Sequence, residues 1–386
     1  MRLQELDSIR GLAAISVVIG HILLIVPFAS TYIEASPLRI FWAGGEAVIL
    51  FFILSGLVLS LPLYNIKGKF LYKEYLIKRF FRIYTPYIFW LVFSFYMSSI
   101  FLGVNIPELG EWFNGKWGLE FDWSLLLQHL FLIGNFPTTE VNPVVWSLVH
   151  EIRISIIFPL LVLIIKRIKS TYVIVLAVSC SIVGFLGDSM HLNEGLGYKN
   201  SYFDTLHYTS MFIMGALLAK KLKQVKETWA GLSTRLRIVL FCLGLVLYTY
   251  SKGIYYILNN DVKLILIDWG VMLGSLLIII SALGSNKISK VLNKRILLFN
   301  GRISYSMYLC HVPILLIVFH NTYGLLPNFI IILLCILCIF VCSYLSNRFL
   351  EEPSIRIGRG VAKKLLTIKR KKELNNDLIQ GSTQKN

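Results

Sequence analysis

The first long apolar stretch of the chain contains two ionisable residues, Arg10 and His21. They are eleven residues apart, and eleven steps of about 100° return to nearly the same side of a helix, about 16 Å further along its axis. Ionisable groups inside an apolar helix are costly and usually indicate function. Because a neutral imidazole accepts a proton from a hydroxyl near physiological pH, His21 is a candidate general base. Arg10 is near the end of the stretch, where an arginine also simply extends its charge to the membrane surface.

A later apolar stretch contains Glu151 and Arg153, shortly after Trp146 and Ser147. Charged groups at this depth need partners or a water-filled cavity. Two interpretations stay open. The charges line a site, or they form a buried ion-pair network that holds helices together.

Arg79 and Arg82 are three residues apart and therefore neighbours on one helix face. Two adjacent guanidinium groups suit bidentate phosphate binding. A basic cluster beside an apolar stretch is also what membrane topology alone produces. Taken singly, this cluster fits either interpretation.

The composition indicates which kind of structural element carries these residues. Of 386 residues, 56% are hydrophobic and 15% charged, against about 45–50% and about 25% in soluble domains. Ten apolar stretches approach the roughly 20 residues that span a bilayer. They cover residues 9–28, 40–63, 84–104, 144–165, 172–187, 205–219, 238–250, 264–284, 303–319 and 329–349. We therefore predict an all-α polytopic membrane protein with ten transmembrane helices.

The basic residues give an independent test of this count, because cytoplasmic loops carry an excess of lysine and arginine. With ten spans both termini lie on one side, and that side holds 32 of the 38 lysines and arginines. We predict cytoplasmic termini, a location in the plasma membrane, and the lipid bilayer as a partner. The net charge of +17 is spread over these loops without a nucleic-acid module, so no nucleic-acid partner is expected.

The chain is expected to form one transmembrane domain over residues 1–353 and a disordered basic tail over residues 354–386. All six cysteines lie in apolar stretches, including the Cys335 and Cys338 pair. In a lipid-embedded helix such a pair is usually small apolar packing. We therefore predict no metal site. The acidic outer loop at residues 105–143 carries three tryptophans, which we interpret as interface anchors ahead of sugar-stacking rings.

Five motifs occur in the order typical of one family, and the chain resembles the acyltransferase-3 membrane proteins from about residue 3 to Pro353. The matching segments are Arg10 with His21, residues 51–56 (FFILSG), Arg79 with Arg82, residues 146–151 (WSLVHE) and residues 304–313 (SYSMYLCHVP). Some relatives carry an additional C-terminal esterase-like domain. This chain is expected to be a stand-alone form, because only 33 residues follow Pro353.

The resemblance implies transfer of an acyl group, usually acetyl, from acetyl-CoA to a hydroxyl of a carbohydrate, glycolipid or related cell-envelope acceptor. Arg10, Arg79 and Arg82 would meet the phosphates of coenzyme A. His21 would be the general base, and Glu151 would orient its imidazole. A substrate or structural site would include Trp146, Ser147, Arg153, Ser304, Tyr305 and His311.

Several alternatives remain open at this point. A multispan transporter or flippase of an envelope precursor would also carry buried Glu, His and Arg residues for proton coupling. A scaffold without chemistry would leave these intramembrane charges unexplained. Direct transfer and an acyl-histidine intermediate fit equally well, and the acceptor, the acyl length and the oligomeric state are not determined by the sequence.

Overall fold

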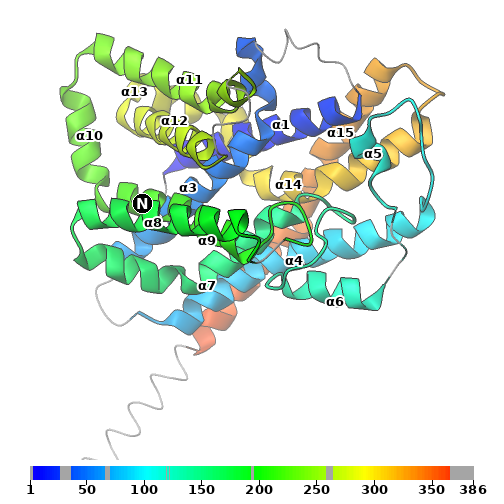
Figure 1. Cartoon of the computed structure of the whole chain (residues 1–386), viewed down its shortest axis with the longest axis horizontal. Coiled ribbons are helices and arrows are strands. Elements are labelled where there is room, and N and C mark those ends of the chain that lie inside the picture. Colours follow the sequence, from blue (N-terminus) through cyan, green and yellow to red (C-terminus); the bar gives the residue numbers. More distant parts are fainter. Residues whose placement is uncertain are drawn as a thin grey trace, which may run out of the picture.

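The computed structural model describes residues 3–26, 36–65, 70–118, 120, 122–192, 195–257 and 264–365. Helices make up most of these residues, and the described ranges contain no β-strand. The predicted all-α fold is therefore confirmed (Figure 1).

The helices follow one another along the chain. Their bounds are α1 Gln4–Ile25, η1 Pro37–Trp42, α3 Gly44–Tyr64, α4 Tyr72–Ile100, α5 Glu111–Asn114, α6 Trp123–Phe131, α7 Val145–Arg167, α8 Ser170–Ser189, α9 Tyr202–Lys220, α10 Leu222–Gly231, α11 Thr234–Ile257, α12 Leu264–Gly284, α13 Asn286–Leu292, α14 Arg295–Thr322, α15 Asn328–Ser346 and the π-helical η2 Asn347–Glu351. The helix that begins with α15 continues through η2 to Leu365. Most of the predicted basic tail, residues 366–386, lies outside the described residues.

Within the described ranges, nine helices are long and apolar enough to cross a membrane. The sequence predicts ten. The helix that is not among the nine is α9, which contains the predicted sixth span. Its first turns carry Asp204, Thr205 and His207, and these polar residues lower its apolarity. The count of ten is therefore not confirmed, and the cytoplasmic side of the termini stays a prediction.

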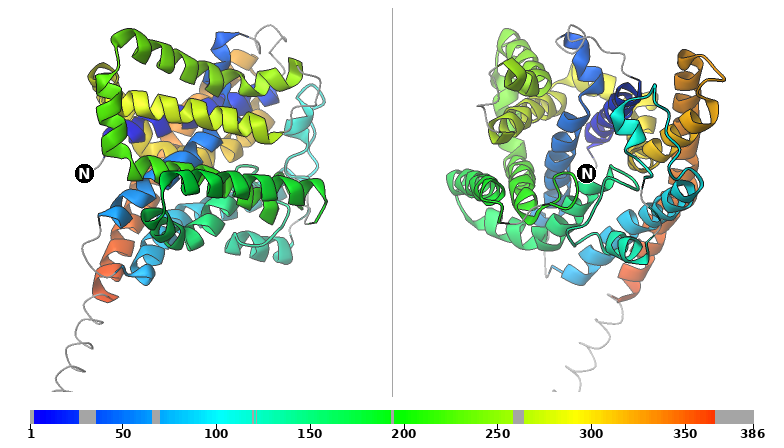
Figure 2. Two further views of the ribbon diagram at one scale, coloured as in Figure 1. Left: turned by 60° about the vertical axis from the view of Figure 1, so that its left-hand side comes forward. Right: turned by 45° about the vertical axis from the view of Figure 1, so that its right-hand side comes forward.

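Helices α1, α3 and α14 form the centre of the molecule. α1 packs against α14 on one side and α3 on the other, and α3 packs along α9. Around this centre lie the pairs α8 with α9 and α11 with α12, and α15 packs against the outside of α14 (Figure 1). The two turned views in Figure 2 show α11 and α12 together on one side and α15 on the opposite side. The helices that carry candidate site residues are joined by these contacts, since α1 and α7 pack against α3, and α14 packs against α1 and α4.

Close approach of α1 and α14 depends on two glycines. A Cβ on Gly11 would come within 2.6 Å of the backbone nitrogen of Gly301, and a Cβ on Gly301 would collide with the backbone of Asp7. Small residues at such a crossing let two membrane helices touch through their backbones. This contact brings the helix of Arg10 and His21 directly against the helix of His311.

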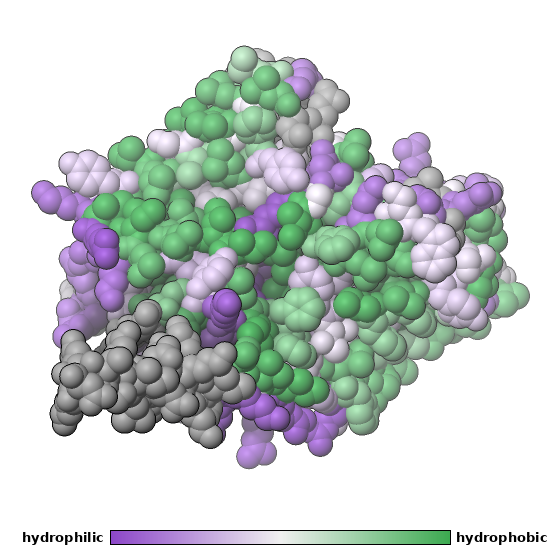
Figure 3. Space-filling model, turned by 90° about the horizontal axis from the view of Figure 1, so that it is seen from below, coloured by the Kyte–Doolittle hydropathy of each residue, from purple (hydrophilic) through white to green (hydrophobic). Residues whose placement is uncertain are grey.

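The outer faces of the helices are apolar. Along α4 and α7 the exposed side chains include Phe89, Val92, Tyr96, Ile157 and Leu160. Figure 3 shows one face of the molecule as largely hydrophobic, with hydrophilic residues gathered mainly at its margins. Exposed apolar surface of this extent fits contact with lipid and not with water.

Candidate active site

A cavity opens between α1, α3, α4, α7 and α14 and contains about 830 Å³ of space, counted with its open mouth. Seven residues that the sequence predicted for the site line it. These are Arg10, Arg79, Arg82, Ser147, Glu151, Ser304 and Tyr305. The structure therefore brings together residues that are up to 295 positions apart in the chain. Along α3 the lining runs from Val48 to Leu59, which is about 16 Å of helix.

One end of the cavity is cationic. Nη2 of Arg79 donates to Oε1 of Glu151 at 2.8 Å and to Oγ of Ser155 at 2.7 Å. Arg10 donates weakly to the backbone oxygen of Leu54 at 3.4 Å. Arg82 is exposed, and in the described part of the chain it has neither a hydrogen bond nor an ion pair. Three guanidinium groups thus meet one carboxylate, so this end carries a net positive charge.

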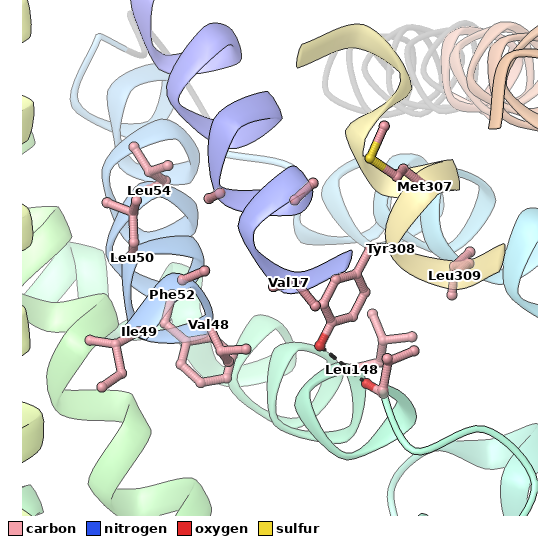
Figure 4. Close-up of a cluster of buried hydrophobic side chains, with 14 of the residues drawn as sticks. Val17, Val48, Ile49, Leu50, Phe52, Leu54, Leu148, Met307, Tyr308 and Leu309 are labelled. Atoms are coloured by element: carbon pink, nitrogen blue, oxygen red, sulfur yellow. Dashed lines mark hydrogen bonds between the residues drawn. The ribbon is translucent and has the colours of Figure 1, made fainter. Parts of the chain in front are cut away.

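The other part of the cavity has apolar walls and ends in a pair of hydroxyl groups. Val48, Phe51 and Leu148 line it. The hydroxyls of Ser147 and Tyr308 are 2.7 Å apart. Figure 4 shows Tyr308 reaching from α14 towards α7, near Leu148.

His21 does not line this cavity but lies close behind its hydroxyl end. Its Nδ1 is 3.0 Å from the backbone oxygen of Val17 and 3.2 Å from Nε2 of His311. The ring of His311 is in turn 6.0 Å from the ring of Tyr308, centroid to centroid. Tyr308 therefore belongs to both regions, because it lines the cavity and its ring faces the histidine pair.

The expected contact between Glu151 and His21 is wrong. The carboxylate of Glu151 forms an ion pair with Arg79, whereas the ring of His21 faces Val17 and His311. The physical reason is that Glu151 lies on α7 beside α4, where the nearest partner for its charge is a guanidinium group. A buried carboxylate without such a partner would be strongly unfavourable.

A short segment around α5 covers His21. The ring of Trp112 in α5 lies 5.1 Å from the His21 ring. The ammonium of Lys116 is 5.6 Å from the Trp112 ring. Burial lowers the pKa of Lys116, although the Glu140 carboxylate acts in the opposite direction. The residues above His21 are therefore aromatic and cationic.

Arg153 and Trp146 do not line the cavity. Arg153 donates from its three nitrogens to the backbone oxygens of Ile133, Gly134, Asn200 and Ser201 and to the hydroxyl of Thr205. It therefore ties the loop before α7 to the start of α9. The ring of Trp146 packs against His150, Tyr198 and Tyr208. Both residues therefore contact groups outside the cavity lining.

Ser304 and Tyr305 line the cavity mainly as parts of α14. The hydroxyl of Ser304 donates to the oxygen of Gly301 at 2.9 Å, and that of Tyr305 donates to the oxygen of Ile83 at 2.8 Å. Tyr308, which the sequence analysis did not single out, is the residue that links the cavity to His311. Its position within the segment SYSMYLCHVP, three residues before His311, was the available signal.

The described residues contain no group of three or more His, Cys, Asp or Glu side chains that could hold a metal ion. The polar groups of the cavity are three arginines, hydroxyls and one carboxylate. This set suits phosphate binding and hydroxyl chemistry.

Comparison with known proteins gives one match. The family model Acyl_transf_3, described as an acyltransferase domain, covers residues 3–348. No curated protein and no solved structure matches the sequence significantly.

Proposed function

The chain belongs to the Acyl_transf_3 family of acyltransferases, and on that premise we propose that it transfers an acyl group, acetyl by preference, from coenzyme A to a hydroxyl of a carbohydrate or related cell-envelope acceptor. The observation that supports this proposal most is that the two ends of the cavity carry different chemical groups. Three arginines lie at one end, and the Ser147 and Tyr308 hydroxyls lie towards the histidine pair.

The cationic end suits the phosphates of the donor. Arg82 is exposed, and among the described residues Arg10 makes a single long hydrogen bond. Guanidinium groups bind phosphate oxygens in pairs of parallel hydrogen bonds. Arg79 is already bonded to Glu151 and Ser155, so we assign it mainly to positioning and Arg82 to the direct contact.

The apolar part of the cavity suits the chain that carries the thioester. With its phosphates at Arg82, the donor would extend along α3 towards Tyr308. There the hydroxyl of Tyr308 would turn from Ser147 and donate a hydrogen bond to the thioester oxygen, on which negative charge develops during attack, while Ser147 keeps its bond to the oxygen of Val144. Donors placed in this way in a low-dielectric site are often the largest single contribution to catalysis.

His21 would take the proton of the acceptor hydroxyl as its oxygen attacks the thioester carbon. The new carbon–oxygen bond forms, the carbon–sulfur bond breaks, and the proton passes to the departing thiolate. General base catalysis of this kind accelerates a reaction by about 10²–10⁴-fold. Because Trp112 covers His21 and Lys116 lies over the Trp112 ring, the acceptor would approach beside this loop.

The lysines and arginines between the helices predict how the protein is oriented in the membrane. We propose that the arginine end faces the cytoplasm of a plasma-membrane protein with cytoplasmic termini. Arg79 and Arg82 belong to the basic first part of α4, and an excess of lysine and arginine marks the cytoplasmic side of membrane helices. The acceptor would then arrive from the opposite side or laterally from the bilayer.

The experiment compares membranes with and without the protein for transfer of labelled acetyl groups from acetyl-CoA into envelope material. We expect label in carbohydrate or glycolipid only when the wild-type protein is present. A membrane preparation with abundant intact protein and no label in any acceptor would contradict the proposal, and uptake of an envelope precursor without acylation would favour a transporter.

A further inference from the structure

His21 and His311 contact each other although 290 residues separate them in the sequence. Nε2 of His311 lies 3.2 Å from Nδ1 of His21, and the ring centroids are 5.0 Å apart. His311 is fully buried. The contact of Gly11 with Gly301 holds the two helices together. The pair is thus a built part of the interface between α1 and α14.

A backbone carbonyl determines where His311 carries its proton. Nδ1 of His311 lies 3.1 Å from the oxygen of Met307. A carbonyl oxygen only accepts hydrogen bonds, so Nδ1 of His311 must carry the hydrogen. A fully buried ring without a carboxylate partner among the described residues is neutral. Nε2 of His311 therefore holds a lone pair, and this lone pair faces His21.

The same reasoning determines the protonation of His21. Its Nδ1 faces two acceptors, the oxygen of Val17 at 3.0 Å and Nε2 of His311 at 3.2 Å. Only a hydrogen on Nδ1 satisfies both contacts. In the neutral ring the lone pair then lies on Nε2. The opposite tautomer would place the Nδ1 lone pair against an oxygen and a second lone pair.

We propose that His311 is a positioning residue that holds His21 in the tautomer and orientation of a general base, an inference that rests on the proposed function. His311 accepts the hydrogen on Nδ1 of His21 and leaves Nε2 of His21 free for the acceptor proton. When the acceptor O–H bond breaks, that proton binds Nε2 and the His21 ring becomes positive. The hydrogen bond from Nδ1 to His311 is then charge-assisted and stronger.

The contribution of His311 differs from that of Val17. The Val17 oxygen lies on the same helix as His21, one turn away, so it fixes the proton but not the placement of the ring relative to the cavity. His311 lies on α14, one turn from Tyr308. It therefore fixes the ring of His21 relative to the residue that lines the cavity. A buried carboxylate does the same for the histidine of a hydrolytic triad.

The first test does not depend on activity. In protein labelled with ¹⁵N-histidine, we expect a scalar coupling across the hydrogen bond between Nδ1 of His21 and Nε2 of His311. His21→Ala and His311→Ala assign the signals, and each should abolish the coupling. A wild-type spectrum in which His21 carries its hydrogen on Nε2, or in which the coupling is absent, would overturn the proposal.

The second test measures transfer. His311→Gln keeps an acceptor on a side chain of similar reach, whereas His311→Ala removes it. We expect kcat to fall about 100-fold in His311→Ala with donor KM unchanged, and to stay within about tenfold of wild type in His311→Gln. His320→Gln is the matched control, because His320 lies on the same helix with both ring nitrogens facing other backbone oxygens.

The two tests distinguish two kinds of failure. If the coupling is present but wild-type protein transfers no acyl group, the proposed function fails and the histidine pairing stands. If transfer is normal in wild type and His311→Ala stays within about threefold of it, a difference far below the usual effect of general base catalysis, the positioning role of His311 is wrong. Should His311→Ala not fold, His311→Gln and the wild-type spectrum still decide.

Discussion

His21 is the residue on which the proposed chemistry depends most. It lies behind the hydroxyl end of the cavity, next to His311 and below Trp112. We expect His21→Ala to lose transfer by at least about 100-fold, because the acceptor hydroxyl then has no general base. Coenzyme A should still bind, since the three arginines are unchanged. The measurement is initial transfer rate together with donor affinity in purified protein, and normal turnover would exclude this role.

Arg82 offers a separate test of the donor site. Arg82→Ala should weaken coenzyme A binding about tenfold or more, since a charge-assisted hydrogen bond contributes about 1.5–3 kcal/mol. Arg82→Lys should restore only part of the affinity, because an ammonium cannot form the bidentate contact. Equilibrium binding to purified protein measures both.

Lys78→Ala is the matched control for Arg82. Lys78 is on the same helix, but it pairs with Glu74 and does not line the cavity. Arg79→Ala is a poorer choice, because it would leave Glu151 without its ion-pair partner and destabilise the protein directly. Equal donor affinity in Arg82→Ala, Lys78→Ala and wild type would reduce the arginine cluster to a topology signal.

For single residues, the sequence predicted which of them lie together at the cavity better than it predicted which of them contact each other. Arg10, Arg79, Arg82 and Glu151 do share one cavity, because helix periodicity and motif type fix which face each residue occupies. The partner of Glu151 could not be predicted, because it depends on which helices become neighbours. The same holds for the pairing of His21 with His311.

Among the elements, α9 contains the one predicted span that is not among the nine candidate membrane helices of the described residues. His207 of α9 forms a hydrogen-bonded chain with its neighbours. The indole of Trp269 donates to Ser181 at 2.8 Å, Ser181 is 2.7 Å from Nδ1 of His207, and Nε2 of His207 is 3.2 Å from Asp268. The chain links α8, α9 and α12, so the polar residues of α9 serve helix packing.

This hydrogen-bonded chain should make a measurable contribution to the stability of the folded protein. Asp268→Ala leaves Nε2 of the half-buried His207 ring without its partner, and we expect a loss of about 1–3 kcal/mol in the free energy of unfolding. Glu227→Ala is the control, because it removes an exposed ion pair with Lys223 and should cost less than about 1 kcal/mol. Thermal unfolding in detergent compares the two, and equal melting temperatures would show that the buried link adds nothing.

His129 in the short helix α6 is expected to make the stability of the folded protein sensitive to acid. Burial lowers the pKa of His129 to about 4, whereas an unfolded histidine titrates near 6.5. Between these values the unfolded chain binds a proton that the folded protein excludes, so stability is full above about pH 6.5 and falls as the pH drops towards 4. His129→Gln should lose less stability than wild type between about pH 7 and about pH 5 in thermal unfolding. Identical pH dependence in both proteins would contradict this assignment.

Across the whole molecule, the groups of the proposed site follow one another from the arginine end of the cavity to Trp112. The arginine end of the cavity lies near the basic start of α4, and the apolar walls, the hydroxyl pair, the histidine pair and the cover of Trp112 follow. Such an order would let an acyl group pass from a donor on one side to an acceptor on the other. Coenzyme A itself would not have to cross.

Sealed vesicles of known orientation test this central claim most directly. Inside-out vesicles expose the predicted cytoplasmic face, and added acetyl-CoA should there acetylate acceptor in the lumen without coenzyme A appearing in the lumen. Right-side-out vesicles given the same donor should show no transfer. Equal acetylation from both sides, or intact donor accumulating inside, would contradict the account.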